Sequence, residues 1–176
     1  MPDAFIALGS NLGDRREHLR FAARRLREEG CDIAAGSALY ATAPVGIPGG
    51  GEFLNAVIAV RTALGPRRLL ELCLRIEAEA GRKREGKPPP DFAAAAPAWT
   101  SRTLDLDLLG YGDLAVDEPG LVLPHPRLTG RPFVLAPLRE VAPDWKVGGR
   151  SVSCWYDDVA KSGANRLDGT ENWFWH

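Results

Sequence analysis

The chain has 176 residues, of which 45% are hydrophobic and 26% are charged, and its formal net charge is -1 at pH 7. This length and composition predict a single soluble domain with a hydrophobic core of its own. A net charge this small excludes a general attraction to nucleic acid or to a membrane surface, although it allows a local basic pocket. The cysteines are scattered and form no CxxC pair, which indicates reduced thiols. The sequence also shows no basic leader and no apolar run of about 20 residues, so we expect a cytoplasmic protein.

The first half of the chain alternates between strand and helix signals. Asp14 is placed to cap a helix, because its carboxylate can accept the free N–H groups of the first turn, and Gly30 ends that helix. A stretch rich in Gly and Pro at 43–51 predicts a loop. The expected elements are a strand at 4–8, a helix at 14–29, and strands at 32–40 and 53–63.

The second half predicts one more core helix, one more core strand and several additions. Pro66 can open a helix in its first turn, where a missing N–H costs little, and Gly81 ends it. Residues 82–98 form a long irregular segment, which is uncommon in a compact domain unless the loop is functional. The remaining expectations are a strand at 103–108, a hairpin from 111–114 and 121–123, a turn at 124–127, and a helix at 131–142.

The order of the core elements is βαββαβ. This order is typical of an α+β fold of the ferredoxin-like class, in which helices pack on an antiparallel sheet. The hairpin and the helix at 131–142 are expected as additions to that core. Five aromatic residues in the tail favour a strap that packs on the same domain, with a subunit interface as the alternative; they are Trp155, Tyr156, Trp173, Phe174 and Trp175.

The strongest chemical signal lies between Arg102 and Leu109. The sequence alternates strictly from Thr103 to Leu108, so leucines face one side of a strand while Asp105 and Asp107 face the other. The two Asp Cα atoms are then about 6.6–6.8 Å apart. At this spacing two carboxylates can converge on hard cations such as Mg²⁺. Asp is disfavoured in strands, so the pair needs a reason, and the alternative is a half-exposed strand with a solvated acidic face.

Basic residues from several segments strengthen the interpretation as a metal and phosphate site. Guanidinium groups suit phosphate oxygens, because they present several donors in one plane. Each arginine alone would be a solvated surface charge, and a histidine between two prolines would be a turn residue. The residues in question are Arg82, Lys83, Arg84, Arg102, His125, Arg127 and Arg131. The chain has no GxxxxGK[ST] pattern, which excludes a P-loop.

Several short motifs follow one another between residues 4 and 145. They read ALGSNLG from Ala7, YATAPVG from Tyr40, FLNA from Phe53, GRKR from Gly81, RTLDLD from Arg102, PHPR from Pro124 and RPFVLAPL from Arg131. In this order they resemble the 6-hydroxymethyl-7,8-dihydropterin pyrophosphokinase family of folate biosynthesis. The resemblance implies a pyrophosphokinase domain at 1–145, followed by an aromatic-rich extension at 146–176. We expect a monomer or a weak homo-oligomer.

The resemblance implies transfer of pyrophosphate from ATP to the hydroxymethyl group of the pterin, which gives AMP and the pterin diphosphate. In such enzymes the Asp pair, here Asp105 and Asp107, holds two Mg²⁺ ions. Catalytic contacts to the triphosphate are implied for Arg82, Arg84 and Arg102. Further ATP contacts are implied for Glu77, Trp99, Leu108, His125 and Arg131. The sequence shows no strong general base for the substrate hydroxyl, and Asp107 is the nearest candidate to accept its proton.

For the pterin, the resemblance implies two sandwiching rings, Phe53 and Phe133, and an amide, Asn55, that reads the edge of the heterocycle. A flat heterocycle binds well between aromatic faces with hydrogen bonds around its rim. Further contacts are implied for Asn11, Thr42, Ala43, Pro44 and Val45. Without the resemblance both phenylalanines would be core residues, whereas Asn in a strand is disfavoured.

The chain departs from the family pattern in its loops. An insertion rich in Pro and Ala at 86–97 lengthens the loop that closes over ATP in such enzymes, and WTSR from Trp99 replaces the more usual WGPR. Two alternative functions are disfavoured. A non-catalytic sensor should have lost the Asp pair, which is present here. A ferredoxin-like RNA-binding domain should show exposed aromatic residues and a positive net charge. Another metal-dependent phosphotransferase is the closest rival.

Overall fold

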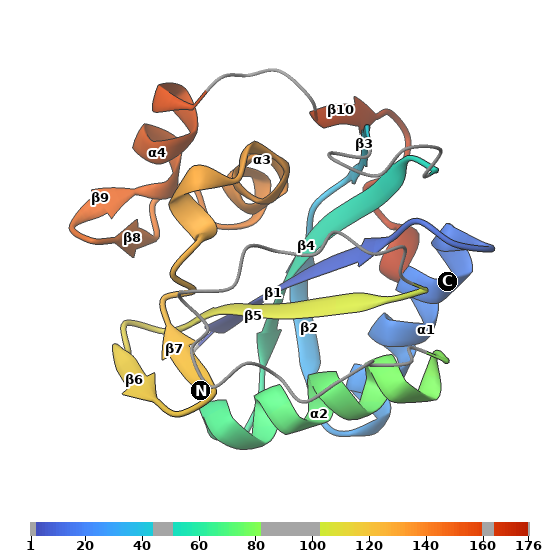
Figure 1. Ribbon diagram of the computed structural model, residues 1–176, viewed down its shortest axis with the longest axis horizontal. Helices are drawn as coiled ribbons and strands as arrows, with labels where there is room; N and C mark the ends of the chain where they lie inside the picture. The colour runs from blue at the N-terminus through green and yellow to red at the C-terminus, as the bar shows by residue number, and fades with distance from the viewer. Residues whose placement is uncertain (1–2, 44–50, 82–102, 160–163, 176) are drawn as a thin grey trace.

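The computed structural model describes residues 3–43, 51–81, 103–159 and 164–175 (Figure 1). Its element order confirms the βαββαβ core of an α+β, ferredoxin-like fold. The core elements are β1 (Asp3–Ser10), α1 (Arg15–Glu28), β2 (Asp32–Gly36), β3 (Leu39–Thr42), β4 (Phe53–Arg61), α2 (Pro66–Glu79) and β5 (Asp105–Tyr111). The later elements are β6 (Val116–Glu118), β7 (Leu121–Leu123), η1 (Leu128–Gly130), α3 (Pro132–Val141), β8 (Lys146–Val147), β9 (Arg150–Ser151), α4 (Val152–Asp158), β10 (Ala164–Leu167) and η2 (Trp173–Trp175).

The main sheet is antiparallel and has the strand order β10-β3-β4-β1-β5, with β2 also paired to β4. β2 and β3 lie end to end along β4, because Gly36 pairs with Ile58 and Tyr40 pairs with Asn55. The predicted single strand at 32–40 is therefore two strands with a break between Gly36 and Leu39, and the second continues to Thr42.

Helices cover both faces of this sheet (Figure 1). α1 and α2 pack against one face, where Ile6 and Leu8 of β1 join the larger hydrophobic cluster. α3 and α4 pack against the other face, where Phe5 of β1 and Val57 of β4 join a second cluster. Burial on both faces explains why β1 and β4 are apolar along most of their length instead of alternating.

The ends of the core helices follow the sequence signals. Asp14 caps α1, and its Oδ1 accepts the N–H of Glu17 at 3.1 Å. Gly30 has a φ of +83°, a conformation that favours glycine, and its N–H and that of Cys31 donate to carbonyls of the last turn of α1. Pro66 opens α2. These predictions are confirmed.

The predicted hairpin is present, but its first strand was placed wrongly. Tyr111 ends β5 instead of opening the hairpin, and the strand that pairs with β7 is β6, in which Val116 pairs with Leu123. The reason is burial: the Tyr111 side chain lies in the core, and its hydroxyl donates to the carbonyl of Leu64 at 2.9 Å. Gly112, with a φ of +53°, then turns the chain.

The tail runs along the sheet and back to the first helix. β10 pairs with β3 at the edge of the sheet, and η2 contacts α1 (Figure 1). Trp173 and Phe174 are buried in the larger cluster. A Cβ on Gly36 would lie 2.3 Å from the Phe174 ring, so the bare backbone there makes room for this ring. No helix in the described ranges is both long and apolar enough to cross a bilayer.

Candidate active site

Asp105 and Asp107 stand on the face of the sheet that α3 covers. Their alternating neighbours Leu104, Leu106 and Leu108 are buried in the larger cluster under α1 and α2. Since successive side chains of a strand point to opposite faces, both carboxylates point away from that cluster, and both residues are half-buried. The predicted alternation is confirmed.

Strand register brings an amide into line with the first carboxylate. Gly9 of β1 pairs with Asp105 of β5 on one side and with Asn55 of β4 on the other. Directly paired residues of antiparallel strands share a face, so Asn55 and Asp105 face the same space across Gly9. A Cβ on Gly9 would lie 3.2 Å from the Asn55 Oδ1 and 4.0 Å from the Asp105 Cβ. Gly9 therefore leaves an open floor between the two side chains.

A pocket opens above this floor, beneath the first turn of α3. The pocket brings together the Asp pair, which we expect on the ATP side, with Asn55 and Phe133, which we expect on the pterin side. The residues that line it are Ala7, Leu8, Gly9, Asn55, Ala56, Asp105, Asp107, Phe133 and Val134. One side of the pocket is acidic, and the other offers an amide and an aromatic ring.

Asn55 is held in place by the neighbouring strand. It is only 8% exposed, and its Nδ2 donates to Thr42 Oγ1 at 2.8 Å. Phe53 pairs with Thr42 across the strands and lies two residues before Asn55, hence on the same face. Ala43 follows β3 and is exposed, whereas Asn11 follows β1 and is buried.

Arg131 connects the acidic side of the pocket with α3. It is the N-cap residue of the helix, and its guanidinium donates to Asp107 Oδ2 at 3.4 Å. The same guanidinium lies 5.9 Å from the centroid of the Phe133 ring. A cation at this place adds positive charge beside the carboxylates, where a polyphosphate would need it.

His125 is held as a neutral ring. Its backbone N–H donates to the carbonyl of Leu109 at 2.8 Å, and its Nδ1 accepts the N–H of Arg127 at 3.1 Å. Burial, followed by the positive charges of Arg131 and Arg127, lowers the pKa of His125 to about 4. The ring is thus uncharged at neutral pH, and the remaining hydrogen lies on Nε2, which can donate to a ligand.

Glu77 has a role that the sequence did not predict. It is 1% exposed on the inner face of α2, and its Oε1 accepts the N–H of Leu106 at 2.7 Å. Leu106 lies between the two aspartates, so Glu77 fastens the strand that presents them. A glutamate within the apolar stripe of α2 was the signal that could have revealed this contact. The Leu108 side chain lies in the core, so an ATP contact from this residue would come from its backbone.

Part of the expected site lies outside the described residues. These positions are Pro44, Val45, Arg82, Arg84, Trp99 and Arg102. They include all three arginines expected to contact the triphosphate.

The donor set fits Mg²⁺ bound together with a phosphate ligand. Within the described ranges, no group of three or more His, Cys, Asp or Glu side chains could hold a metal ion by itself. Mg²⁺ is usually bound by one or two carboxylates and completes its shell with water and substrate phosphates. Asp105 and Asp107 supply such oxygen ligands from one strand face, and the Asp107 side chain is 36% exposed.

Comparison with known proteins gives a consistent result over most of the chain. The family model described as 7,8-dihydro-6-hydroxymethylpterin-pyrophosphokinase (HPPK) matches residues 5–143. The 2-amino-4-hydroxy-6-hydroxymethyldihydropteridine pyrophosphokinase of Methylorubrum extorquens is 40% identical over 169 residues, which cover 96% of this chain and 100% of the relative. The protein of the same name from Bacillus subtilis is 41% identical over 139 residues, covering 78% and 77% of the two chains.

Solved structures show the same fold. A crystal structure described as HPPK-DHPS in complex with substrates has a TM-score of 0.70 at 12% identity. The match covers 94% of this chain and 46% of the solved one, so this chain spans about half the length of that protein. A Plasmodium falciparum HPPK-DHPS structure matches with a TM-score of 0.68 at 14% identity, covering 94% and 48% of the two chains.

Proposed function

The chain belongs to the 7,8-dihydro-6-hydroxymethylpterin-pyrophosphokinase family, and on this premise we propose how its residues serve the two substrates. It is an ATP-dependent pyrophosphokinase of folate biosynthesis. The enzyme transfers pyrophosphate from ATP to the hydroxymethyl group of 6-hydroxymethyl-7,8-dihydropterin and releases AMP. The observation that carries the residue assignment is that the Asp pair lines the same pocket as Asn55 and Phe133.

On the ATP side, Asp105 and Asp107 are the proposed ligands of two Mg²⁺ ions. Bound there, Mg²⁺ would neutralise charge on the phosphate groups. Arg131 adds a fixed positive charge beside Asp107, and the neutral His125 offers its Nε2 hydrogen. We assign Glu77 to the ATP side through its hydrogen bond to the Leu106 backbone between the two aspartates, and a further ATP contact to the Leu108 backbone. The same proposal extends to residues outside the described ranges, which are Arg82, Arg84, Trp99 and Arg102.

On the pterin side, we propose that Asn55 forms hydrogen bonds with the edge of the heterocycle. Its Nδ2 is already bonded to Thr42, and its Oδ1 faces the space above Gly9. Phe133 on α3 and Phe53 on β4 are the proposed stacking partners, since both belong to elements that border this space. We place Asn11, Thr42 and Ala43 around the rim, together with Pro44 and Val45 outside the described ranges.

The chemical step follows from this division. The hydroxymethyl oxygen of the pterin attacks the β-phosphorus of ATP, and the bond from that phosphorus to the oxygen bridging the α-phosphate breaks. AMP leaves with the bridging oxygen, and the hydroxyl proton goes to an acceptor, for which Asp107 is the nearest candidate. The chain contributes mainly by holding both substrates in line and by placing charge around the phosphates.

The domain boundaries, the cellular location and the oligomeric state are also proposals. We assign the activity to residues 1–145 and regard 146–176 as an extension that packs on the same domain, which the burial of Trp173 supports. Three cysteines are free in the structure, Cys31, Cys73 and Cys154, and they support a cytoplasmic location. A monomer or a weak homo-oligomer is the proposed state.

The test is an incubation of the protein with ATP and Mg²⁺, with and without 6-hydroxymethyl-7,8-dihydropterin. We expect AMP to accumulate only when the pterin is present, in an amount equal to the pterin consumed. ADP as the product would favour another metal-dependent phosphotransferase. AMP formed without pterin would contradict the assignment of the pocket.

A further inference from the structure

The strand that follows α1 is interrupted at Ser37 and Ala38, and both residues are fully buried. A break in a buried strand leaves backbone groups that need other hydrogen-bond partners. Ser37 supplies two of these itself, because its hydroxyl donates to the carbonyl of Ala38 at 2.7 Å and accepts the N–H of Val57 at 3.0 Å. The other partners come from distant parts of the chain.

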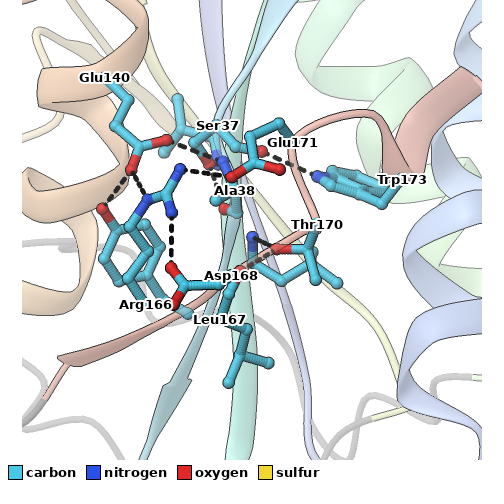
Figure 2. A network of polar contacts seen from close by, with 12 residues as sticks. Ser37, Ala38, Glu140, Arg166, Leu167, Asp168, Thr170, Glu171 and Trp173 are labelled. Atoms are coloured by element: carbon cyan, nitrogen blue, oxygen red, sulfur yellow. Dashed lines mark hydrogen bonds and ion pairs between the residues drawn. The ribbon is translucent and has the colours of Figure 1, made fainter.

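The C-terminal tail pairs two of the remaining groups (Figure 2). The indole Nε1 of Trp173 donates to the carbonyl of Ser37 at 2.9 Å. The hydroxyl of Thr170 accepts the N–H of Leu39, also at 2.9 Å. The segment 164–175, which we call the C-terminal strap, therefore supplies two of the hydrogen-bond partners of the broken strand.

Glu140, on the last turn of α3, joins three parts of the fold (Figure 2). One carboxylate oxygen accepts the N–H of Ala38 at 2.9 Å, and the other accepts the Tyr40 hydroxyl at 2.6 Å and the Arg166 Nε at 2.7 Å. Burial opposes ionisation of this group, but the three hydrogen bonds outweigh burial and hold the pKa of Glu140 below its usual range. A charged carboxylate thus ties α3 to β3 and to the strap.

Arg166 is held in its place from several sides. In β10 it pairs with Tyr40 of β3, so its backbone is fixed at the sheet edge. Its other guanidinium nitrogens lie 3.0 Å from Asp168 and 2.7 Å from Glu171, both within the strap (Figure 2). The geometry of the strap therefore determines where the guanidinium meets Glu140.

The hydrogen-bond network of Tyr40, Glu140 and Arg166 borders the pterin half of the proposed site. Tyr40 pairs directly with Asn55, and its ring packs against Ala136 of α3. Glu140 follows Phe133 by about two helical turns, so the two side chains lie on the same side of α3. The hydrogen bond from Tyr40 to Glu140 thus joins the strand beside Asn55 to the helix that carries Phe133.

We propose that Glu140 and Arg166 are positioning residues for pterin binding. Acting through Tyr40, they fix the distance between α3 with Phe133 and the strands that carry Asn55. This inference rests on the proposed function, because the pterin pocket is part of that proposal.

Loss of these contacts is expected to weaken binding of the pterin more than binding of ATP. A stacked heterocycle needs a slot of defined width, and a displacement of about 1 Å can cost as much as 100-fold in rate or binding. Both aspartates for ATP lie on β5, which is separated from β3 by β4 and β1, and α3 contributes only Arg131 to the ATP side. Loosening the β3 edge should therefore weaken pterin binding and largely spare ATP.

The experiment compares Arg166→Ala, Arg166→Lys and Tyr40→Phe with the full-length wild-type enzyme. KM for 6-hydroxymethyl-7,8-dihydropterin is measured at saturating ATP, and KM for ATP at saturating pterin. We expect Arg166→Ala to raise the pterin KM about tenfold and to change the ATP KM by less than about twofold. Arg166→Lys should recover part of the loss. Tyr40→Phe removes only the link to Glu140 and should raise the pterin KM even where Arg166→Ala fails to fold.

Arg150→Ala is the matched control. Arg150 also forms an ion pair, with Asp158 at 2.5 Å, and its side chain is 44% exposed, against 38% for Arg166. We expect its pterin KM to equal that of the wild type. An unchanged pterin KM in both Arg166→Ala and Tyr40→Phe, or an equal rise in both KM values, would overturn the proposal. A wild-type enzyme that forms no AMP from ATP and pterin would instead contradict the proposed function.

Discussion

Asn55 and Asp105 lie on either side of Gly9 in one row of cross-strand pairs, so an amide and a carboxylate face the same space two strands apart. Neighbouring strands are about 4.8 Å apart, which separates the two Cα atoms by roughly 10 Å. This distance suits one site that binds a heterocycle at one end and a charged phosphate group at the other. The glycine between them keeps the floor of the pocket free.

Gly9→Ala is expected to impair the site without unfolding the protein. The new Cβ would lie 3.2 Å from Asn55 Oδ1, so the amide must shift by a few tenths of an ångström. We expect the pterin KM to rise about tenfold, while the free energy of unfolding changes by less than about 2 kcal/mol. Gly65→Ala is the control, because a Cβ there meets nothing within 4 Å. Equal kinetics for Gly9→Ala and wild type would show that the floor is not part of the site.

Asp105→Ala and Asp107→Ala should each remove nearly all activity. Both side chains are half-buried on the polar face of β5, so their loss leaves the leucine face in the core intact. We expect kcat to fall by at least about 100-fold, with the far-ultraviolet circular dichroism unchanged. Asp117→Ala, on the exposed strand β6, serves as the control. If both active-site variants unfold, the aspartates have a structural role instead.

His125 makes stability depend on pH. Its pKa is about 4 in the folded protein and 6.5 as the ordinary value, so between these pH values the unfolded state binds a proton that the folded state does not. Stability should therefore fall as the pH drops from 6.5 to 4, by up to roughly 1.4 kcal/mol per pH unit. Urea unfolding at pH 7 and pH 4.5 measures this loss. His125→Gln should lose less stability than wild type over the same interval, and an identical loss would contradict the buried, neutral ring.

Trp173→Phe tests the strap as part of the fold. The variant keeps an aromatic ring but leaves the buried Ser37 carbonyl without its indole donor. We expect the free energy of unfolding to fall by about 2–4 kcal/mol, from the lost hydrogen bond and the smaller ring together. Trp175→Phe is the control: Trp175 is 56% exposed, and its replacement should cost less than about 1 kcal/mol. Equal losses in the two variants would show that the Trp173 hydrogen bond contributes nothing.

The sequence predicted those parts of the molecule that are encoded locally. The alternation around Asp105 and Asp107 was readable because one face of β5 is core and the other is the pocket. The helix ends at Asp14 and Gly30 were readable because capping depends on residues only a few positions apart.

The parts that escaped prediction depend on distant partners. The break at Ser37 is stabilised by Trp173, which lies 136 residues further along the chain, and Ala38 finds its acceptor in Glu140, 102 residues away. No local pattern marks such a break. The placement of the hairpin failed for a similar reason, because burial of Tyr111 against Leu64 extends β5 beyond its alternating segment.

In the proposed site the metal-binding carboxylates and the pterin share one pocket. Mn²⁺ accepts the same oxygen ligands as Mg²⁺ and is paramagnetic, so it accelerates the nuclear relaxation of protons near it. The decisive measurement is the relaxation rate of the pterin protons in a complex of the enzyme with Mn²⁺ and a non-hydrolysable ATP analogue. We predict strong enhancement, corresponding to a separation of about 10 Å or less, which disappears in Asp105→Ala. Pterin that binds with no enhancement above that of free Mn²⁺ would place the two ligands in separate sites and contradict a shared pocket.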